Sequence, residues 1–172
     1  MTYTQWRLSR VMAAFLIVMM LGGFCITALA DDAEEAKLIA VLKGGDDWFA
    51  KDAACRRLRV IGTAHSVPAL AALLPDEKLS HIARYALEPM PFPEVNGILR
   101  DALAQCNGLV KVGIISSLGV RKDAEAVPVL SSLLADADPQ IAQAAAGALG
   151  SIGGRGAIEP LETALAQASR QL

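Results

Sequence analysis

The sequence has few of the residues on which disulfide scaffolds, metal sites and nucleic-acid binders depend. Among its 172 residues are three cysteines, two histidines and only 5% aromatic residues. Three cysteines are too few for a disulfide scaffold, and two lone histidines cannot build a dinuclear metal centre. The formal net charge is −2, so the chain lacks the basic excess that neutralises nucleic-acid phosphates. We therefore expect no nucleic-acid partner, no metal and no cofactor.

Hydrophobic residues are plentiful at 53% of the chain, too many for a disordered protein, and the length fits about one domain. The first 30 residues have the organisation of an export signal. Arg7 and Arg10 precede an uncharged, mostly apolar run over residues 11–30. Ala28 and Ala30 offer the small residues that a signal peptidase accepts. The sequence thus predicts cleavage after Ala30, and a bacterial protein that is periplasmic or secreted.

Two alternatives to simple cleavage stay open for this segment. The run over residues 11–30 would be about 30 Å long as a helix, so it could remain as an uncleaved membrane anchor. Cys25 could instead be lipidated, although Phe24 stands where such sites prefer a small residue. In each case the protein contacts a membrane only through its N-terminal segment.

The chain from Asp31 onward is rich in alanine and poor in aromatic rings. Without the two arginines of the signal its net charge is −4, and 27 of its residues are alanine. Alanine is the best helix former, and the β-branched and aromatic mixture that favours strands is mostly absent. This composition predicts an all-α fold.

Two apolar patterns recur together about every 30 residues along this part of the chain. The first is a small or apolar residue followed four places later by a leucine, at Leu58, Leu87, Leu118 and Leu149. The second is Val or Ile followed three places later by Leu or Ile, beginning at Val67, Val95, Val127 and Ile158. These spacings are helical, so each unit is expected to be a helix, a short turn and a second helix.

Residues typical of turns and helix caps occur at the expected boundaries of these helices. The expected turn breakers are Gly62, Gly119 and Gly153 with Gly154, and Pro68 and Pro128 open the second helices. The expected N-caps are Asp46 or Asp47, Asp123 and Asp138. An additional helix over about 33–43 would end at Gly44.

A two-helix unit of this size buries its apolar stripe only by stacking on its neighbours. The predicted architecture is therefore a right-handed α-solenoid of about four two-helix repeats with a leading capping helix. Residues 1–30 form the signal or anchor, residues 31–45 the capping helix, and residues 46–172 the repeat domain.

The units resemble the short HEAT-like repeats that also occur in bilin lyases. The resemblance covers about residues 46–166 and is carried by AAGALGSIG at 145–153, AVPVLSSLL at 126–134 and SVPALAALL at 66–74. It implies a protein-binding scaffold, by analogy of fold. HEAT-like enzymes that hold two irons use His-Glu pairs, whereas here His65 precedes Ser66 and His81 precedes Ile82. We expect no catalytic centre.

Binding residues are predicted on two surfaces. His81, Arg84, Tyr85 and Glu88 share one helical face. They form either a binding patch or internal contacts, in which Arg84 pairs with Glu88 while the other two bond to the neighbouring unit. The second surface is the curved face lined by the second helices. Its expected polar residues are Arg100, Asp101, Ser131, Ser132, Glu162 and Thr163.

Several apolar side chains are expected in the core. Cys55 and Cys106 are interpreted as buried thiols, with a disulfide between them as the alternative. Phe92, in a proline-rich loop with Met90, is expected to be tucked in. Trp48 and Phe49 are expected to pack under the leading helix.

The predicted function is a non-catalytic protein-protein interaction scaffold outside the cytoplasm, with a protein partner that the sequence does not identify. One alternative is the same scaffold anchored through residues 11–30. Another is a repeat-type accessory domain of an exported, lyase-like enzyme. A third is the front part of a larger exported protein whose other domains hold the chemistry.

Overall fold

The computed structural model describes residues 32–45 and 47–170. The predicted signal, with Ala28, Ala30 and Cys25, lies outside the described residues. The chain divides into two compact units, residues 1–37 and 38–172. The described residues of the first unit are helical, and their helix continues to residue 43 in the second unit. Within the described ranges, no helix is long and apolar enough to cross a membrane.

The described part of the second unit is built of helices and their connections, without strands. The first helices of the repeats are α2 (Trp48–Ile61), α4 (Ser80–Leu87), α6 (Gly108–Val120) and α8 (Pro139–Ile152). The second helices are α3 (Val67–Ala71), α5 (Glu94–Gln105), α7 (Val127–Ser132) and α9 (Arg155–Ala168). Two 3₁₀ turns, η1 (Ala124–Ala126) and η2 (Leu133–Ala135), flank α7. The predicted all-α fold of helix pairs is confirmed.

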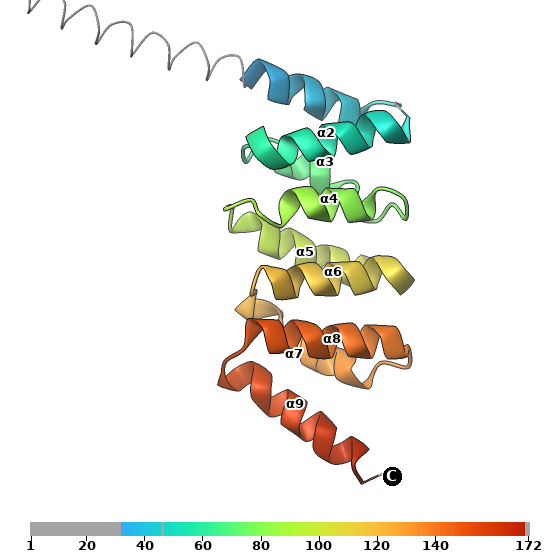
Figure 1. Cartoon of the computed structure of the whole chain (residues 1–172), viewed down its shortest axis with the longest axis vertical. Helices are drawn as coiled ribbons and strands as arrows, with labels where there is room; N and C mark the ends of the chain where they lie inside the picture. Colours follow the sequence, from blue (N-terminus) through green and yellow to red (C-terminus); the bar gives the residue numbers. More distant parts are fainter. Residues whose placement is uncertain (1–31, 46, 171–172) are drawn as a thin grey trace, which may run out of the picture. The chain divides into compact units, whose positions relative to one another are not determined.

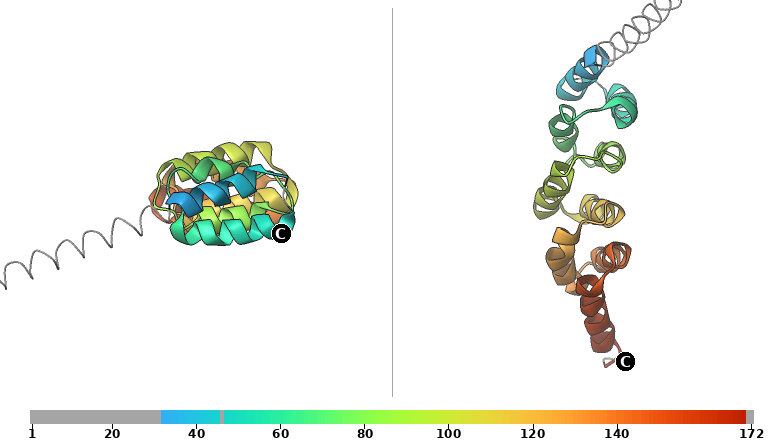
Figure 2. Two further views of the ribbon diagram at one scale, coloured as in Figure 1. Left: turned by 90° about the horizontal axis from the view of Figure 1, so that it is seen from above. Right: turned by 90° about the vertical axis from the view of Figure 1, so that its left-hand side faces the viewer.

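Helices of the same kind stack on one another. The first helices contact in the order α2, α4, α6 and α8, while α3 contacts α5 and α7 contacts α9. Figure 1 looks onto the column of first helices, and the right-hand view of Figure 2 shows the two columns side by side. The four leucines of the first sequence pattern are all fully buried in the core: Leu58, Leu87, Leu118 and Leu149. Burying a leucine stabilises a fold by about 1.5–3 kcal/mol, so one such residue in each repeat joins the pairs into a shared core.

Three of the predicted caps begin helical segments. The Asp47 carboxylate accepts from the Ala50 amide at 2.9 Å at the start of α2. The Asp138 carboxylate accepts from the Gln140 amide at 2.8 Å at the start of α8. Asp123 caps η1 in the same way. Each bond satisfies a backbone N–H that the helix itself leaves unpaired, which is why aspartate at these positions predicted the boundaries.

Gly119 was expected in a turn, and that prediction is wrong. It lies inside α6, where a Cβ would stand 2.8 Å from the Cα of Ala148 in α8. The absence of a side chain there lets the two helices pack backbone to backbone. Gly62 follows the end of α2, as predicted, and Gly153 and Gly154, with φ of 70° and 78°, lie between α8 and α9. Only glycine adopts such a backbone without strain.

The expected packing of Trp48 and Phe49 is also wrong. Their side chains are 43% and 75% exposed. The buried stripe of α2 consists of Ala54, Cys55 and Leu58, and the helical period places Phe49 on the opposite side. By contrast, Met90 is buried and Phe92 is half-buried against the core, as predicted.

Candidate interaction surfaces

The residues predicted to form one patch on α4 separate into an inward pair and an outward pair. Arg84 and Glu88 are half-buried, whereas His81 and Tyr85 are exposed. The predicted internal arrangement holds for Tyr85, which contacts a neighbouring repeat, whereas Arg84 and Glu88 bond to α6. Whether these four residues bind a partner stays a prediction.

The inward pair meets at Ser117 of α6. Arg84 Nη1 donates to the Gly113 carbonyl at 3.0 Å and to Ser117 Oγ at 3.3 Å. The Ser117 hydroxyl donates to Glu88 Oε1 at 2.7 Å. Burial lowers the pKa of the Arg84 guanidinium, and the nearby charge of Glu88 opposes that shift. These contacts fasten α4 to α6, which makes Arg84 and Glu88 part of the junction between repeats two and three.

The outward pair lies on the column of first helices. The Arg59 guanidinium of α2 is centred 4.1 Å from the centroid of the Tyr85 ring, a cation–π contact between repeats one and two. The Tyr85 side chain nevertheless remains 37% exposed. His81, one turn earlier on α4, is exposed as well.

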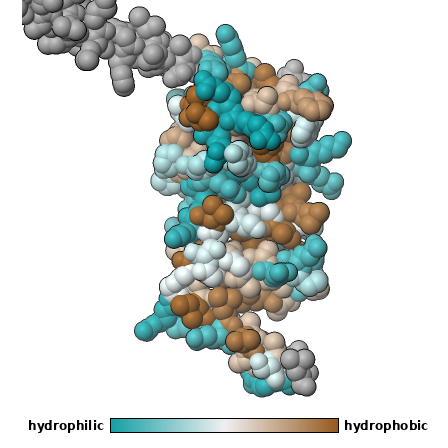
Figure 3. Space-filling model, viewed as in Figure 1, coloured by the Kyte–Doolittle hydropathy of each residue, from teal (hydrophilic) through white to brown (hydrophobic). Residues whose placement is uncertain are grey.

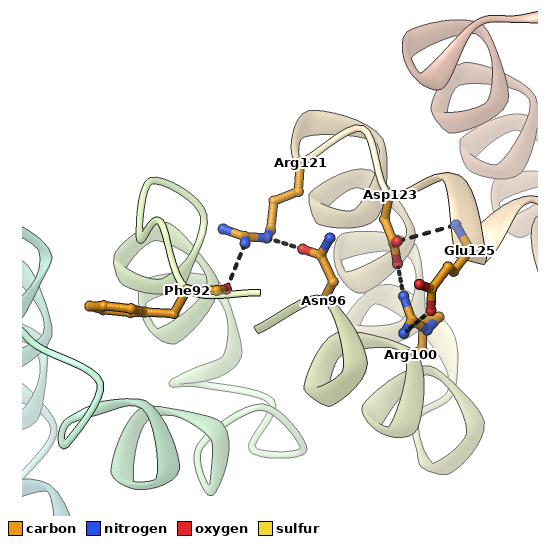
Figure 4. Close-up of polar contacts among 6 residues, drawn as sticks. All are labelled: Phe92, Asn96, Arg100, Arg121, Asp123 and Glu125. Atoms are coloured by element: carbon orange, nitrogen blue, oxygen red, sulfur yellow. Dashed lines mark hydrogen bonds and ion pairs between the residues drawn. The ribbon is translucent and has the colours of Figure 1, made fainter. Parts of the chain in front are cut away.

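Arg121, just after α6, fastens the proline-rich loop of repeat two (Figure 4). Its guanidinium donates to the carbonyls of Leu87, Glu88, Met90 and Phe92, and to Oδ1 of Asn96. Burial lowers its pKa, and Asp123 and Glu88 oppose that shift. We did not single out this residue from the sequence. Its partners lie 25 to 34 residues away, so no local pattern marks it.

Arg100 of α5 completes the junction between repeats two and three (Figure 4). Its guanidinium binds the buried carboxylate of Asp123, and its Nη2 lies 2.8 Å from Glu125 Oε2. Arg100 was predicted as a binding residue near the second helices. The structure places it in an ion-pair network within the protein, while its neighbour Asp101 is exposed.

Two grooves open between successive second helices, and they collect other predicted residues. The α7–α9 groove has a volume of about 610 Å³, and Ser131 and Thr163 are among its lining residues. The α3–α5 groove has a volume of about 220 Å³, and Asp101 lines it. Ser132 and Glu162 are exposed on α7 and α9 without lining either groove.

The α7–α9 groove combines an apolar wall with hydrogen-bond acceptors. Leu134 and Ala164 supply apolar surface, and Glu159 adds a carboxylate. The hydroxyls of Ser131 and Thr163 donate to carbonyls of their own helices, at 2.7 and 2.9 Å. Their hydrogens are therefore engaged, and their oxygen lone pairs remain for a ligand's N–H groups.

The described residues hold no group of three His, Cys, Asp or Glu side chains that could ligate a metal. The two described cysteines, Cys55 and Cys106, are buried free thiols, as interpreted from the sequence. Burial, and after it the charge of Asp52, raises the pKa of the Cys55 thiol from 9.0 to about 12, against an opposing effect of Lys51. Because the thiolate is the reactive form of cysteine, this residue is chemically inert in the folded protein.

Residues 98–172 match the family model of HEAT repeats, from within α5 to beyond α9. HEAT repeats typically mediate protein–protein interactions and are usually non-catalytic, and no catalytic family was found. No curated protein matches the chain. The described part of the chain is all-helical, and its packing is consistent with HEAT-type repeats.

Proposed function

We propose that the protein is a non-catalytic scaffold that binds a protein partner along its second helices, outside the cytoplasm. The observation that carries the proposal is the pair of grooves between successive second helices. They are lined by Asp101, Ser131 and Thr163, three of the residues that the repeat pattern predicts for that face. The helices that line the grooves pack against neighbouring helices of the repeat domain.

The contacts at the junction between repeats two and three favour binding at the α3–α5 groove, because they hold α5, which forms one wall of that groove. The contacts of Arg84, Arg100 and Arg121 hold α5, α6 and the segment leading to α7 in one arrangement. A preformed surface loses little conformational entropy when a partner docks, so more of the contact energy appears as affinity. A partner segment would place an apolar side chain against Leu134 and Ala164 and direct N–H donors to Ser131 and Thr163.

The proposed location rests on the composition of residues 1–30 and is tested by sequencing the N-terminus of the protein isolated from its native cell. A mature chain that begins at Asp31 supports export with cleavage. An intact N-terminus in the membrane fraction would instead support the anchored alternative through residues 11–30.

The binding proposal is tested with a matched pair of arginine substitutions. Thr163 and Ser151 are both exposed, and both donate their hydroxyl to the carbonyl four residues earlier. Thr163 lines the α7–α9 groove and Ser151, on α8, does not. Thr163→Arg should block the groove, whereas Ser151→Arg adds the same charge on the column of first helices.

The wild-type chain and both variants are used to capture partners from the exported fraction, after circular dichroism has shown equal helix content. We expect one set of proteins to bind the wild type and Ser151→Arg and to be lost with Thr163→Arg. Partners retained equally by all three chains would contradict binding in the α7–α9 groove.

A further inference from the structure

A second surface lies on the column of first helices. Its residues are aromatic and basic, unlike the hydroxyl and aliphatic residues of the α7–α9 groove. This α2–α4 patch consists of Trp48, Phe49, Arg56, Arg59 and Tyr85, all exposed. In Figure 3 hydrophilic residues gather over the part of this face where α2 and α4 lie, with apolar residues beside them. Tryptophan, tyrosine and arginine are the residues most enriched among the energetically dominant contacts of protein interfaces.

Arg59 lies at one end of the patch, in the last turn of α2. Its guanidinium stacks on Tyr85 at 4.1 Å, which fixes the plane of the group. Among the residues that the structure describes, no carboxylate forms an ion pair with Arg59. A stacked guanidinium keeps its N–H donors in the plane, at the geometry that binds both oxygens of a carboxylate. Arg59 is thus an oriented, exposed cation that no carboxylate of the described residues neutralises.

The acidic residue nearest in sequence on α2 does not compete for Arg59. Asp52 is held by Arg56, whose Nε and Nη2 donate to its two oxygens at 2.7 and 3.3 Å. The hydrogen bond and the charge of Asp52 raise the pKa of Arg56, so this pair is neutral as a whole. Arg59 is therefore the residue of the patch that attracts an incoming anion.

The charge of α2 contrasts with that of the rest of the chain. On the face of α2 that carries the patch, Arg56 and Asp52 pair with each other, which leaves the charge of Arg59 as the net charge of that face. The chain from Asp31 onward has a net charge of −4. A local basic surface on an acidic protein steers an acidic partner to that surface and repels it elsewhere.

The aromatic end of the patch, at the start of α2, offers apolar contact about 15 Å along the helix from Arg59. The rings of Trp48 and Phe49 meet edge to face, with centroids 5.0 Å apart and planes at 81°. The indole N–H of Trp48 donates to the Lys78 carbonyl at 3.3 Å, which orients the ring. Phe49 is 75% exposed, so its ring contributes little to the hydrophobic core and is available to a partner.

We propose that the α2–α4 patch binds an acidic segment of a protein partner. An aspartate or glutamate side chain of the segment is bound by both edge nitrogens of Arg59. An apolar side chain about five residues further along an extended segment packs on Trp48 and Phe49. This proposal rests on the proposed interaction function and adds a second surface with a defined partner chemistry.

The test selects peptides from a random library displayed on phage, using the full chain as target. Enriched peptides are labelled, and their affinities are measured by fluorescence anisotropy for the wild type, Arg59→Glu, Arg59→Lys and Arg155→Glu. Arg155 is an exposed arginine on α9, so its reversal makes the same change of charge far along the sequence from the patch. Circular dichroism establishes that each variant is folded.

We expect peptides rich in aspartate or glutamate, and a loss of about tenfold or more in affinity with Arg59→Glu or with the amide versions of the peptides. Arg59→Lys should lose several-fold, because lysine keeps the charge without the planar pair of donors. Arg155→Glu should remain within about twofold. Raising NaCl from about 50 to 500 mM should weaken binding, because the contact is exposed to screening.

Other outcomes overturn the inference and separate it from the proposed function. Peptides that lose binding with Thr163→Arg but not with Arg59→Glu would support the grooves and overturn the α2–α4 patch. No enrichment, or peptides without acidic residues, would overturn it too. Binding of phosphatidylserine vesicles through Arg59, without any acidic peptide, would assign the patch to a membrane surface instead.

Discussion

At the scale of single residues, Gly113 stands where a side chain would overlap the guanidinium of Arg84. Arg84 can reach the Gly113 carbonyl and Ser117 only because α6 has no Cβ at this position. The two residues are 29 positions apart, so their dependence on each other is invisible in either helix by itself.

Gly113→Ala is expected to leave the protein about 1–3 kcal/mol less stable than Gly147→Ala, because the added methyl group displaces a half-buried guanidinium from its acceptors. Gly147→Ala is the matched control, since nothing lies within 4 Å of a Cβ built there on α8. It should stabilise by about 0.5–1 kcal/mol, because alanine restricts the unfolded chain. Urea unfolding of both variants measures the difference. Equal stabilities would contradict the close contact.

The buried thiol of Cys55 makes a residue-scale prediction about pH. Its pKa is raised from 9.0 to about 12, so the unfolded chain ionises before the folded one. The neutral thiol's contribution to the free energy of unfolding is complete below pH 9.0 and declines as the pH rises toward 12. The wild type should therefore lose about 1.4 kcal/mol per pH unit in that range relative to Cys55→Ala. Urea unfolding across the range tests this, and a difference that does not change with pH would contradict it.

At the scale of elements, the connection between α4 and α5 is held in place by a side chain of the next repeat. The loop after Leu87 contains three prolines and makes few regular backbone bonds of its own, so its carbonyls need another donor. Arg121 supplies that donor from the end of α6, which couples the shape of repeat two to repeat three.

Arg121→Met keeps the length of the side chain and removes its donors. We expect a loss of about 3 kcal/mol in unfolding free energy, because several carbonyls lose a charged partner at once. Arg155→Met, on the exposed start of α9, should change stability by less than about 0.5 kcal/mol. Thermal and urea unfolding provide the comparison. A loss no greater than that of the control would show that the loop holds its shape without Arg121.

At the scale of the whole repeat domain, burial is uneven along the stack. Helix α6 buries Ile114, Ile115, Ser117, Leu118 and Gly119, because helices pack on it from both neighbouring repeats. Helix α9 is similar in length but buries only Ala157, and it contains Pro160. Stability in stacked repeats is a sum of local terms and contacts between neighbours, so α9 has weaker support than α6.

Hydrogen exchange should reveal this difference. Amides in α9 are expected to exchange about tenfold or more faster than those in α6, since opening α9 exposes little apolar surface. Mass spectrometry of peptides from the two helices measures the rates at low protein concentration. Equal protection of the two helices would contradict a weakly held α9.

The sequence by itself determined the helix pairs, their order and most of their boundaries. Periodic leucines such as Leu58 and Leu118, and caps such as Asp47 and Asp138, act within a few residues of themselves, so they can be read locally. The same locality explains two errors, at Gly119 and Phe49. Glycine marks close packing as well as turns, and an aromatic ring predicts burial only if its helical position faces the core.

Only the tertiary structure decided which polar residues face a partner and which face another repeat. Arg84, Tyr85 and Glu88 share one face of one helix, yet two of them serve the junction at Ser117 and one stacks beneath Arg59. Arg121 could not be found at all from its neighbours. Contacts across 25 to 34 residues depend on how one repeat stacks on the next, and that geometry is set by the packing of whole helices.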